Sequence, residues 1–392
     1  MLWNAAAYLT CQLPTIFKSG EYLSVMAASS SLPRYQPEPS KVSPNAPELT
    51  LEDGTIHPIV DRELLQLLVC PRDHLTLEER DRHLVCPSGH RYPIVEGIPI
   101  LLLSETPQTH LEGTRSLQAG ASARSSPTRL PSRPLGEIDL FVQNIIAATN
   151  GMLYIRLIGK LTDYPIPHLR LPLGEGKRFL DIGCNWGRWC IAAARLGYRP
   201  VGIDPSLKGI CAARQVAQQL GVEAHYVVAD GRYLPFANGT FDQVFSYSVL
   251  QHLSKENARL ALREVGRALR SSGSFLVQMP NCFGIRCLYH QIRRGFREGR
   301  DFDVRYWAPR ELALTFRAIL GSARISVDGF FSLNPQISDV RFLPWKYRAV
   351  VYASEALRKI SGIVSPLNYL ADSLYVEGTV RNLGTGHIID RA

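Results

Sequence analysis

A glycine-containing loop with acidic residues before and after it is the part of this sequence best suited to chemistry. Asp181 stands two positions before Gly183, and Gly187 ends the loop. Glycines let a backbone turn sharply and approach a ligand closely. Asp204 follows further along the chain, where an acidic side chain can accept hydrogen bonds from both hydroxyls of a ribose. Together these residues predict a binding site for a ligand that carries a ribose.

The glycine spacing argues against a dinucleotide. The fingerprint G-x-G-x-x-G would need glycines at 183, 185 and 188, but the chain has Asn185 and Arg188. No G-x-x-x-x-G-K-[S/T] sequence occurs, which excludes a P-loop. The loop therefore favours a ribose-containing ligand without a pyrophosphate.

The apolar pattern indicates which elements must position these residues. From Arg178 onward, short apolar runs alternate with helical patterns, which is typical of a parallel sheet covered by helices. Core strands are expected at 178–183, 200–204, 223–229, 242–247 and 274–279, with helices at about 187–196, 207–220 and 255–269. Later elements are expected as a helix near 309–319, a strand near 323–331, a helical insertion near 343–362 and a strand near 373–381. The sequence predicts an α/β fold, Rossmann-like and doubly wound, with a mostly parallel seven-stranded sheet.

Residues that follow the strands should meet, because ligands bind at the carboxyl ends of the strands in such a sheet. The third predicted strand leads into Asp230 and Gly231, and the fourth ends in Ser246 and Tyr247. We therefore expect these residues to lie beside the glycine-containing loop.

Composition divides the chain into four segments. Residues 1–57 are rich in Ser, Pro and Ala without periodicity, which predicts a disordered extension. Residues 58–104 contain short apolar runs separated by Gly and Pro, which predicts a small β-rich, ribbon-like module. Residues 105–136 have the composition of a flexible linker, and residues 137–392 form the main domain. Within this domain, residues 332–370 are expected to form a helical insertion that acts as a lid or as a wall of a substrate pocket.

Five motifs occur in order along residues 178–281. They are Phe179-Leu-Asp-Ile-Gly-Cys-Asn-Trp-Gly187, Val201-Gly-Ile-Asp-Pro-Ser206, Ala229-Asp-Gly-Arg-Tyr-Leu-Pro-Phe236, Phe241-Asp-Gln-Val-Phe-Ser-Tyr-Ser-Val-Leu-Gln-His252 and Ser272-Gly-Ser-Phe-Leu-Val277. At this spacing they resemble the core of the class I S-adenosylmethionine-dependent methyltransferases, in the methyltransferase type 11-like group that acts on small molecules.

The resemblance implies S-adenosylmethionine as the cofactor. It implies that Gly183 and its neighbours hold the methionine part, Asp204 the ribose hydroxyls, and Asp230 with Gly231 the adenine edge. The middle position of the loop, often glycine in that family, is Asn185 here. The expected cofactor-binding residues are Asp181, Gly183, Cys184, Asn185, Gly187, Asp204, Pro205, Asp230, Gly231 and Ser246.

Catalysis of methyl transfer can depend largely on positioning. Transfer from a sulfonium is an in-line displacement with a good leaving group, so holding the acceptor aligned supplies much of the rate. A base is needed only if the acceptor must lose a proton, and His252 or Tyr247 is placed to act as that base. The alternatives are that His252 packs under the end of the sheet and that Tyr247 lines the cofactor pocket.

The motifs do not specify the acceptor. Amino-group methylation of adenine is disfavoured, because the fourth strand leads into Ser246-Tyr-Ser-Val249 rather than [D/N/S]-P-P-[Y/F/W]. The segment 286–310 combines arginines with Tyr289, Tyr306 and Trp307, a mixture able to bind phosphate or stack on rings. The leading hypothesis is a small-molecule or lipid-intermediate methyltransferase. The alternatives are an RNA methyltransferase and a non-catalytic, cofactor-binding scaffold.

Two similar loops in the N-terminal module each place a cysteine and a histidine four positions apart. The pairs are Cys70 with His74 and Cys86 with His90. Zinc takes about four such ligands. Residues 65–103 resemble the short zinc-ribbon-like domain that accompanies some methyltransferases, but the usual C-x-x-C pairs are interrupted here by Asp73 and Gly89. This departure favours a metal-free fold that docks a protein partner or the catalytic domain over a zinc site.

The overall composition bears on compartment and partners. The chain has eight cysteines without the spacing of a disulfide framework, which favours reduced thiols in the cytoplasm. No apolar run reaches the roughly 18 residues needed to cross a bilayer. The apolar N-terminus lacks the basic region of an export signal, because its first cation is Lys18. The net charge of +9 is compatible with RNA, an anionic lipid surface or an acidic substrate.

Overall fold

The computed structural model describes residues 59–122, 138–331 and 335–380. All of these residues belong to one compact unit that begins at residue 58. The expected disordered extension lies outside the described residues, as do residues 123–136 of the expected linker and residues 332–334 of the expected insertion.

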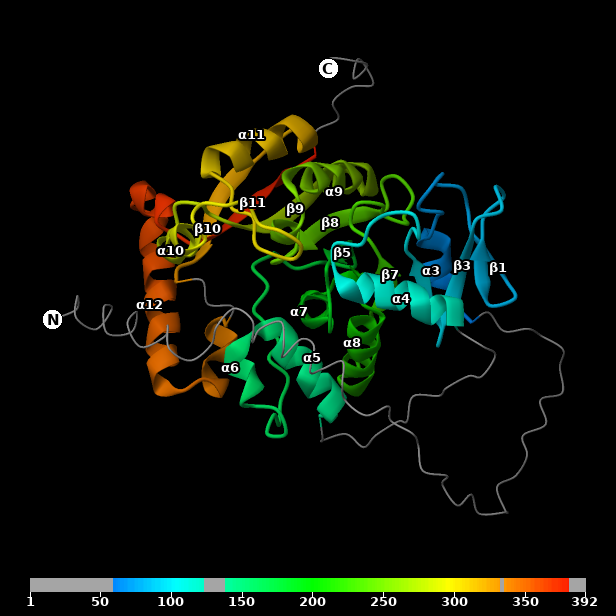
Figure 1. Ribbon diagram of the computed structural model, residues 1–392, viewed down its shortest axis with the longest axis horizontal. Helices are drawn as coiled ribbons and strands as arrows, with labels where there is room; N and C mark the ends of the chain where they lie inside the picture. The colour runs from blue at the N-terminus through cyan, green and yellow to red at the C-terminus, as the bar shows by residue number, and fades with distance from the viewer. Residues whose placement is uncertain (1–58, 123–137, 332–334, 381–392) are drawn as a thin grey trace. The chain divides into compact units, whose positions relative to one another are not determined.

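Seven strands in the described part of the main domain form its sheet. They are β5 (Arg178–Ile182), β6 (Arg199–Asp204), β7 (His225–Ala229), β8 (Phe241–Ser246), β9 (Leu269–Pro280), β10 (Arg324–Gly329) and β11 (Ser373–Thr379). Their order is β7-β6-β5-β8-β9-β11-β10, in which β5 to β9 are parallel and β11 is antiparallel to both of its neighbours. The prediction of a doubly wound, mostly parallel, seven-stranded sheet is confirmed (Figure 1).

Helices cover both faces of this sheet because both faces are apolar. The covering helices are α7 (Arg188–Arg195), α8 (Leu207–Gln219), α9 (Lys255–Ala268) and α11 (Pro309–Leu320). In β5, Leu180 and Ile182 belong to the core that includes α9 and α11, whereas Phe179 packs with Trp189 of α7. Successive side chains of a strand point to opposite faces, so one strand serves both layers. Figure 1 shows α7 and α8 on one side of the strands and α9 and α11 on the other.

The remaining elements of the main domain are helices, one of which falls within the helical insertion expected near 343–362. They are α5 (Leu140–Asn150), α6 (Met152–Ile155), α10 (Ile285–Arg293), α12 (Trp345–Ser361) and the short 3-10 helices at Leu250–His252, Ile337–Phe342 and Ser365–Tyr369. The break between α5 and α6 falls at Gly151, whose φ of 95° lies in a region that favours glycine. In the expected insertion, α12 packs against β10, and the Ser354 hydroxyl donates to the carbonyl oxygen of Phe330 at 3.2 Å. No described helix is both long and apolar enough to cross a membrane.

The N-terminal module is continuous with the main sheet. Its elements are α3 (Arg62–Leu67), β1 (Glu78–Arg80), β2 (His83–Val85), β3 (Arg91–Val95) and β4 (Ile98–Leu101). The strands β1 to β4 form an antiparallel series, and β4 then pairs in parallel with β7, Ile100 opposite Val228 and Leu101 opposite Ala229. Every residue of β4 is buried, because β7 supplies the neighbour that this apolar strand needs. The expected separation of module and main domain by a linker is therefore not what the structure shows.

The expected linker also contains a helix, which corrects the prediction that residues 105–136 are flexible throughout. Helix α4 spans Leu111–Ser122 and packs against α8 and β3. Its buried residues are Gly113, Ser116 and Gly120. The Ser116 hydroxyl donates to the carbonyl oxygen of Pro205 at 2.7 Å and accepts from the backbone N–H of Leu207 at 2.8 Å. Because this contact face is made of small residues, its composition looked like that of a linker.

Candidate functional site

A cavity lies where β5, β6 and β7 end, at the edge of the sheet predicted to bind a ligand. Residues from the strand ends and from two distant segments line it: Gln108, Thr109, His110, Ile182, Gly183, Ile203, Pro205, Ala229, Asp230, Gly231, Val249, Leu250, His252, Leu253 and Phe302. Of the expected cofactor-binding residues, Gly183, Pro205, Asp230 and Gly231 line the cavity directly. The carboxyl ends of the parallel strands thus meet as the sequence predicted.

The loop after β5 can hold its shape only with glycine at two positions. Gly183 and Gly187 have φ angles of 79° and 77°, and Asn185 between them has a φ of 45°. The backbone N–H groups of Gly183 and Cys184 both donate to the carbonyl oxygen of Ile203, at 2.8 and 2.9 Å. A Cβ atom on Gly183 would lie 2.1 Å from Val249 Cγ2, and one on Gly187 would lie 2.7 Å from the Tyr226 hydroxyl.

Asp204 connects this loop to the start of α8. Its Oδ2 accepts from the backbone N–H of Asn185 at 3.0 Å, and its Oδ1 accepts from that of Ser206 at 2.8 Å. Burial raises the pKa of the Asp204 carboxyl to about 6, against the lowering effect of these two N–H groups. The carboxylate therefore organises the loop, and it lies behind the cavity lining, to which its neighbours Ile203 and Pro205 belong.

Asp181, Cys184 and Ser246 lie beneath the cavity rather than in its lining. Asp181 is buried, the Cys190 thiol donates to its Oδ2 at 3.5 Å, and no donor in the described chain reaches its Oδ1. Burial raises the pKa of Asp181 to about 7. The Ser246 hydroxyl donates to the carbonyl oxygen of Ile182 at 3.1 Å. Cys184 is buried against the backbone of β6, where a Cβ on Gly202 would lie 2.7 Å from its sulfur.

Asp230 is paired with an arginine that the sequence analysis missed. The Arg232 Nε–H lies 3.1 Å from Asp230 Oδ1, and its Nη2 lies 2.6 Å from Oδ2. Nη2 also donates to the carbonyl oxygen of Pro107 at 2.9 Å, which ties the cavity wall to the segment after the N-terminal module. An acid and an arginine two positions apart could have suggested the pair, but nothing local indicated Pro107.

Three rings from distant segments gather at one side of the cavity. The rings of His252 and Phe302 stack with centroids 3.9 Å apart, and His110 meets Phe302 edge-on at 4.5 Å. The Nδ1–H of His252 donates to the carbonyl oxygen of Phe302 at 2.7 Å, and its Nε2 accepts from the Gln251 side-chain amide at 3.2 Å. Burial lowers the pKa of His252 to about 4, so the ring is neutral at neutral pH. Neither His110 nor Phe302 was predicted.

Tyr247 does not line this cavity. Its hydroxyl donates to Asp328 Oδ2 at 2.9 Å, and its ring packs against Trp189 with centroids 4.9 Å apart. Burial raises the pKa of the phenol well above its usual value. The hydroxyl therefore stays protonated at neutral pH and is a donor.

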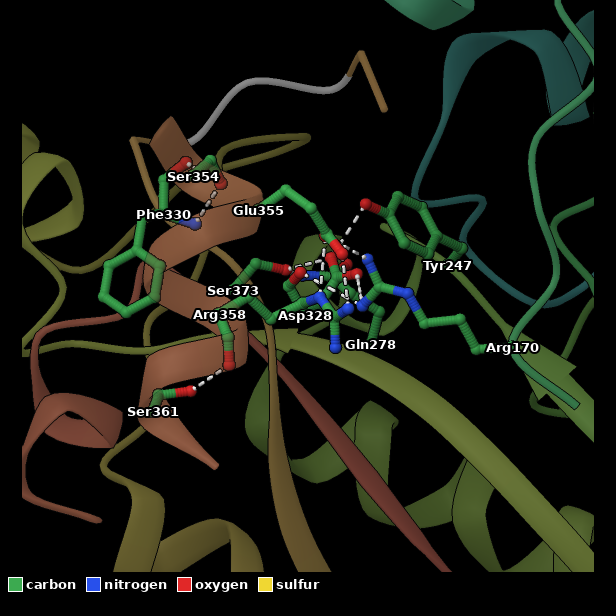
Figure 2. Close-up of polar contacts among 10 residues, drawn as sticks. All are labelled: Arg170, Tyr247, Gln278, Asp328, Phe330, Ser354, Glu355, Arg358, Ser361 and Ser373. Atoms are coloured by element: carbon green, nitrogen blue, oxygen red, sulfur yellow. Dashed lines mark hydrogen bonds and ion pairs between the residues drawn. The ribbon is translucent and has the colours of Figure 1, made fainter. Parts of the chain in front are cut away.

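The partner of Tyr247 stands at the centre of a polar cluster next to α12. Asp328 also accepts from the Ser373 hydroxyl at 2.8 Å and lies 3.4 Å from Arg170 Nη1, and Arg170 Nη2 lies 3.6 Å from Glu355 of α12 (Figure 2). No sequence motif pointed to this cluster, because its members come from five separate segments.

The aromatic residues expected to stack on a ligand are only partly available. Trp307 is buried, and the ammonium of Lys255 lies 4.9 Å from its ring centroid. The expectation that Trp307 stacks on a ligand ring is therefore wrong, because the indole packs in the core beneath α9. Tyr289 of α10 is exposed.

Four side chains of the N-terminal module converge as a candidate metal centre. Cys70, Asp73, Cys86 and His90 place their ligand atoms within 4.8 Å of one another. The His90 Nδ1 lies 3.5 Å from Cys70 Sγ, 3.3 Å from Cys86 Sγ and 3.2 Å from Asp73 Oδ2, and Cys86 Sγ lies 3.5 Å from Asp73 Oδ2. Zinc bonds of about 2.0–2.3 Å in a tetrahedron separate neighbouring ligands by roughly 3.3–3.8 Å. The four residues therefore fit zinc in both type and spacing.

His74 is not part of this cluster. Its Nε2 lies 4.0 Å from Glu264 Oε2, and its backbone adopts a φ of 57°. The left-handed turn brings Asp73 rather than His74 to the cysteines. The four-residue spacing that paired Cys70 with His74 was therefore misleading, whereas Cys86 and His90 do meet.

The part of the chain that supplies most of the cavity lining matches a known protein family. Residues 179–273 match the family described as Methyltransferase domain. This part of the chain is a methyltransferase domain. Its resemblance to the class I S-adenosylmethionine-dependent enzymes is confirmed, while the match stops short of the N-terminal module.

The relatives of this methyltransferase domain share only part of their length with it. A ubiquinone biosynthesis O-methyltransferase of Azorhizobium caulinodans is 33% identical over 107 residues, which are 27% of this chain and 42% of that protein. The same-named protein of Rhizobium etli is 35% identical over 107 residues, with the same shares of 27% and 42%. An uncharacterized protein of Methanocaldococcus jannaschii is 32% identical over 122 residues, 31% of this chain and 44% of that one. The chain thus spans less than half the length of these curated relatives.

Solved methyltransferase structures resemble the chain more distantly. A S-adenosylmethionine-dependent methyltransferase of Methanosarcina mazei is 17% identical with a TM-score of 0.40, covering 56% of this chain and 99% of that one. The phosphoethanolamine N-methyltransferase 2 of Haemonchus contortus, in complex with S-adenosyl-L-methionine, is 18% identical with a TM-score of 0.37, covering 54% and 50%.

Proposed function

We propose that this chain transfers a methyl group from S-adenosylmethionine to a small-molecule or lipid-intermediate acceptor. The observation that carries the proposal is the cavity at the ends of β5, β6 and β7, inside the matched methyltransferase domain. The name shared by two relatives, ubiquinone biosynthesis O-methyltransferase, favours an acceptor hydroxyl on a small molecule. It does not favour the RNA alternative.

In this proposal the roles of the cofactor-binding residues are those that the resemblance implies, and the presence of Gly183, Asp230 and Gly231 in the cavity lining supports them. Gly183 and its loop hold the methionine part, Asp204 accepts from the ribose hydroxyls, and Gly231 beside Asp230 borders the adenine. When bound, S-adenosylmethionine would supply a methyl group on a sulfonium; the acceptor attacks the methyl carbon in line, and S-adenosylhomocysteine is the leaving group. The rings of His110 and Phe302 exclude water from that side of the cavity.

His252 suits the role of base better than Tyr247, because it lines the cavity, although its Nε2 accepts from the Gln251 amide at 3.2 Å and would have to exchange this donor for the acceptor hydroxyl. A pKa of about 4 makes it a weak base, since general bases work best with a pKa near the working pH. Alignment of the acceptor therefore contributes more to the proposed rate than removal of its proton. The Tyr247 hydroxyl already donates to Asp328, so we assign Tyr247 a positioning role. It would hold the polar cluster through which Arg170 contacts Glu355 of α12.

Transfer of a labelled methyl group tests the proposed function. The full chain, incubated with methyl-labelled S-adenosylmethionine and a fractionated extract, is expected to label an organic-soluble small molecule. Asp204→Ala should lose this labelling, because loss of a buried, hydrogen-bonded carboxylate contact costs on the order of 2–3 kcal/mol, roughly 30- to 150-fold in cofactor affinity by calorimetry.

The matched control is Asp242→Ala at the opposite end of the sheet. Asp242 accepts from the backbone N–H of Arg178 at 2.9 Å and pairs with Arg270 at 2.7 Å, so its loss weakens the fold without touching the cavity. A folded wild type that binds no cofactor would contradict the proposal. Label in RNA would support the RNA alternative, and cofactor binding without any product would support a scaffold.

Cofactor affinity should also depend on pH. The ionised Asp204 accepts from ribose hydroxyls, so affinity is expected to rise by up to about tenfold per pH unit as the pH increases toward the carboxyl pKa of about 6. The free energy of unfolding of the unliganded protein should change with pH in the opposite direction. A carboxyl whose pKa is raised in the folded state stabilises the fold below the unfolded pKa of 3.8. This stabilisation is lost as the pH rises through about 6 for Asp204 and about 7 for Asp181. Calorimetry and thermal unfolding across this range measure both trends, and Asp204→Asn should flatten the first. A wild-type affinity that does not change with pH would contradict the assignment.

We further propose that the N-terminal module holds a structural zinc ion through Cys70, Asp73, Cys86 and His90. The separations of the ligand atoms support this, in place of the metal-free fold that the missing C-x-x-C pairs favoured. The parallel pairing of β4 with β7 supports docking of the module on the catalytic domain of the same chain. A separate protein partner stays a secondary proposal.

A cytoplasmic location agrees with the thiols. Free thiols, which a reducing compartment favours, are present at Cys70, Cys86, Cys184, Cys190, Cys211 and Cys282.

A further inference from the structure

Helix α10 turns an apolar stripe toward solvent. Ile285, Leu288, Tyr289 and Ile292 recur at the spacing of one helix face, and all four are exposed, Ile292 by 57%. The one buried residue of the helix is Cys287, on the opposite side. A surface helix normally turns such a stripe to the core. The described part of the chain does not bury this stripe, which is therefore a candidate contact surface for another molecule.

Further exposed apolar residues occur in the segments that follow α10 and α12. Phe296, 67% exposed, follows α10, and Ile363, 87% exposed, follows the end of α12. The backbone N–H of Ile285 donates to the carbonyl oxygen of Leu370, and the Asn281 amide donates to that of Tyr369 at 2.9 Å, so these segments lie together (Figure 1). We call the exposed apolar residues of both segments the α10 surface. Its members are Phe283, Ile285, Leu288, Tyr289, Ile292, Phe296, Ile363, Val364, Tyr369 and Leu370.

The charge around the α10 surface is positive. Arg293, Arg297 and Arg300 are exposed beside the stripe, and Lys359 stands near the end of α12. From Asn281 to Arg300 the sequence has five arginines against one acidic residue, Glu298, and residues 356–371 contain no Asp or Glu. Contiguous exposed apolar residues mark an interaction site. Apolar side chains flanked by cations are what an interfacial helix presents to an anionic bilayer, where aliphatic side chains enter the acyl boundary and arginines meet lipid phosphates.

We propose that the α10 surface docks this chain peripherally on a bilayer that contains anionic lipid. Nucleic acid would use the arginines and Tyr289 but would leave Ile285, Leu288 and Ile292 in water. The same segment runs on to Phe302, whose ring stacks on His252 at the cavity. Docking would therefore hold the cavity near the bilayer. The inference that the acceptor comes from the lipid phase rests on the proposed function, but the docking itself does not.

Vesicle co-sedimentation of the full chain tests the docking. Wild type is expected to bind vesicles of phosphatidylcholine with phosphatidylserine, and to bind phosphatidylcholine alone weakly. Ile292→Ser should weaken binding on the order of tenfold, because an aliphatic side chain no longer enters the apolar phase. Its control is Leu314→Ser on α11, which is 54% exposed but outside the α10 surface and should bind as wild type.

A second pair of variants tests how much the arginines contribute to vesicle binding. Arg293→Gln with Arg297→Gln should weaken binding roughly 30-fold at low salt, since each cation near an anionic surface adds attraction. Arg263→Gln on α9, also exposed, should not. Wild type that fails to bind the anionic vesicles would overturn the proposal. So would loss of binding in the arginine variant combined with full binding by Ile292→Ser, which would indicate a purely ionic ligand such as RNA.

The outcome for docking is separable from that for the proposed function. Cofactor affinity is measured by calorimetry without vesicles, and Ile292→Ser should retain it. If vesicles bind but no cofactor does, the docking stands and the methyltransferase proposal fails. Thermal unfolding confirms that each variant is folded.

Discussion

Alanine at position 183 is expected to abolish cofactor binding, while alanine at position 176 should leave it unchanged. Both glycines have a φ of 79°, so both substitutions carry the cost of about 1–2 kcal/mol for a left-handed backbone. They differ in their surroundings. A Cβ on Gly183 would lie 2.1 Å from Val249 Cγ2, far inside the contact distance, whereas one on Gly176 meets nothing within 4 Å.

The steric clash between a Cβ at position 183 and Val249 should change the shape of the cavity. Val249 lines the cavity and lies beside Leu250 and His252, so moving it away from a new methyl group displaces the wall as well as the loop. Overpacking typically costs about 1–3 kcal/mol, which together with the loop shift should lower cofactor affinity by roughly 100-fold or more. Calorimetry with S-adenosylhomocysteine measures the affinity, and thermal unfolding separates loss of binding from loss of fold. Equal affinities for Gly183→Ala and Gly176→Ala would show that the loop does not hold the cofactor.

The second large effect is expected at the metal centre. Replacing Cys70 and Cys86 together by serine removes two thiolate ligands and should reduce bound zinc from about one equivalent to none, because two of the four ligands are gone. The module has a small core, and the free energy of metal binding is also free energy of folding. Amide exchange should therefore accelerate across 59–103 and stay slow in β5 to β8, with metal content read by elemental analysis.

Cys282→Ser is the matched control, because Cys282 is a free thiol outside the cluster. It should retain zinc and slow exchange in the module. Wild type that holds no zinc after purification in its presence would restore the metal-free fold favoured by the missing C-x-x-C pairs. Equal zinc in wild type and the double variant would place the ion elsewhere.

Local sequence patterns were sufficient where neighbouring residues along the chain decide the structure. The apolar runs of β5 to β8 are buried on both faces, so their periodicity identified them within a few residues. Helix α4 was not predicted, because its buried face consists of Gly113, Ser116 and Gly120. These small residues do not produce the apolar periodicity by which a helix is recognised in a sequence. For β4 the apolar run was recognised but its pairing with β7 was not, because that pairing depends on residues more than a hundred positions away.

The sequence by itself determined that the strands ending at the cavity are parallel, and hence that Gly183, Pro205, Asp230 and Gly231 meet. Parallel strands share one carboxyl edge whatever packs around them. Only the tertiary structure decided which distant groups complete the site: Phe302 stacked on His252, Tyr247 donating to Asp328, and Asp73 rather than His74 beside the cysteines. These contacts depend on how separate segments pack against one another and on the conformation of single backbone turns. Neither produces a periodic pattern of residues in the sequence.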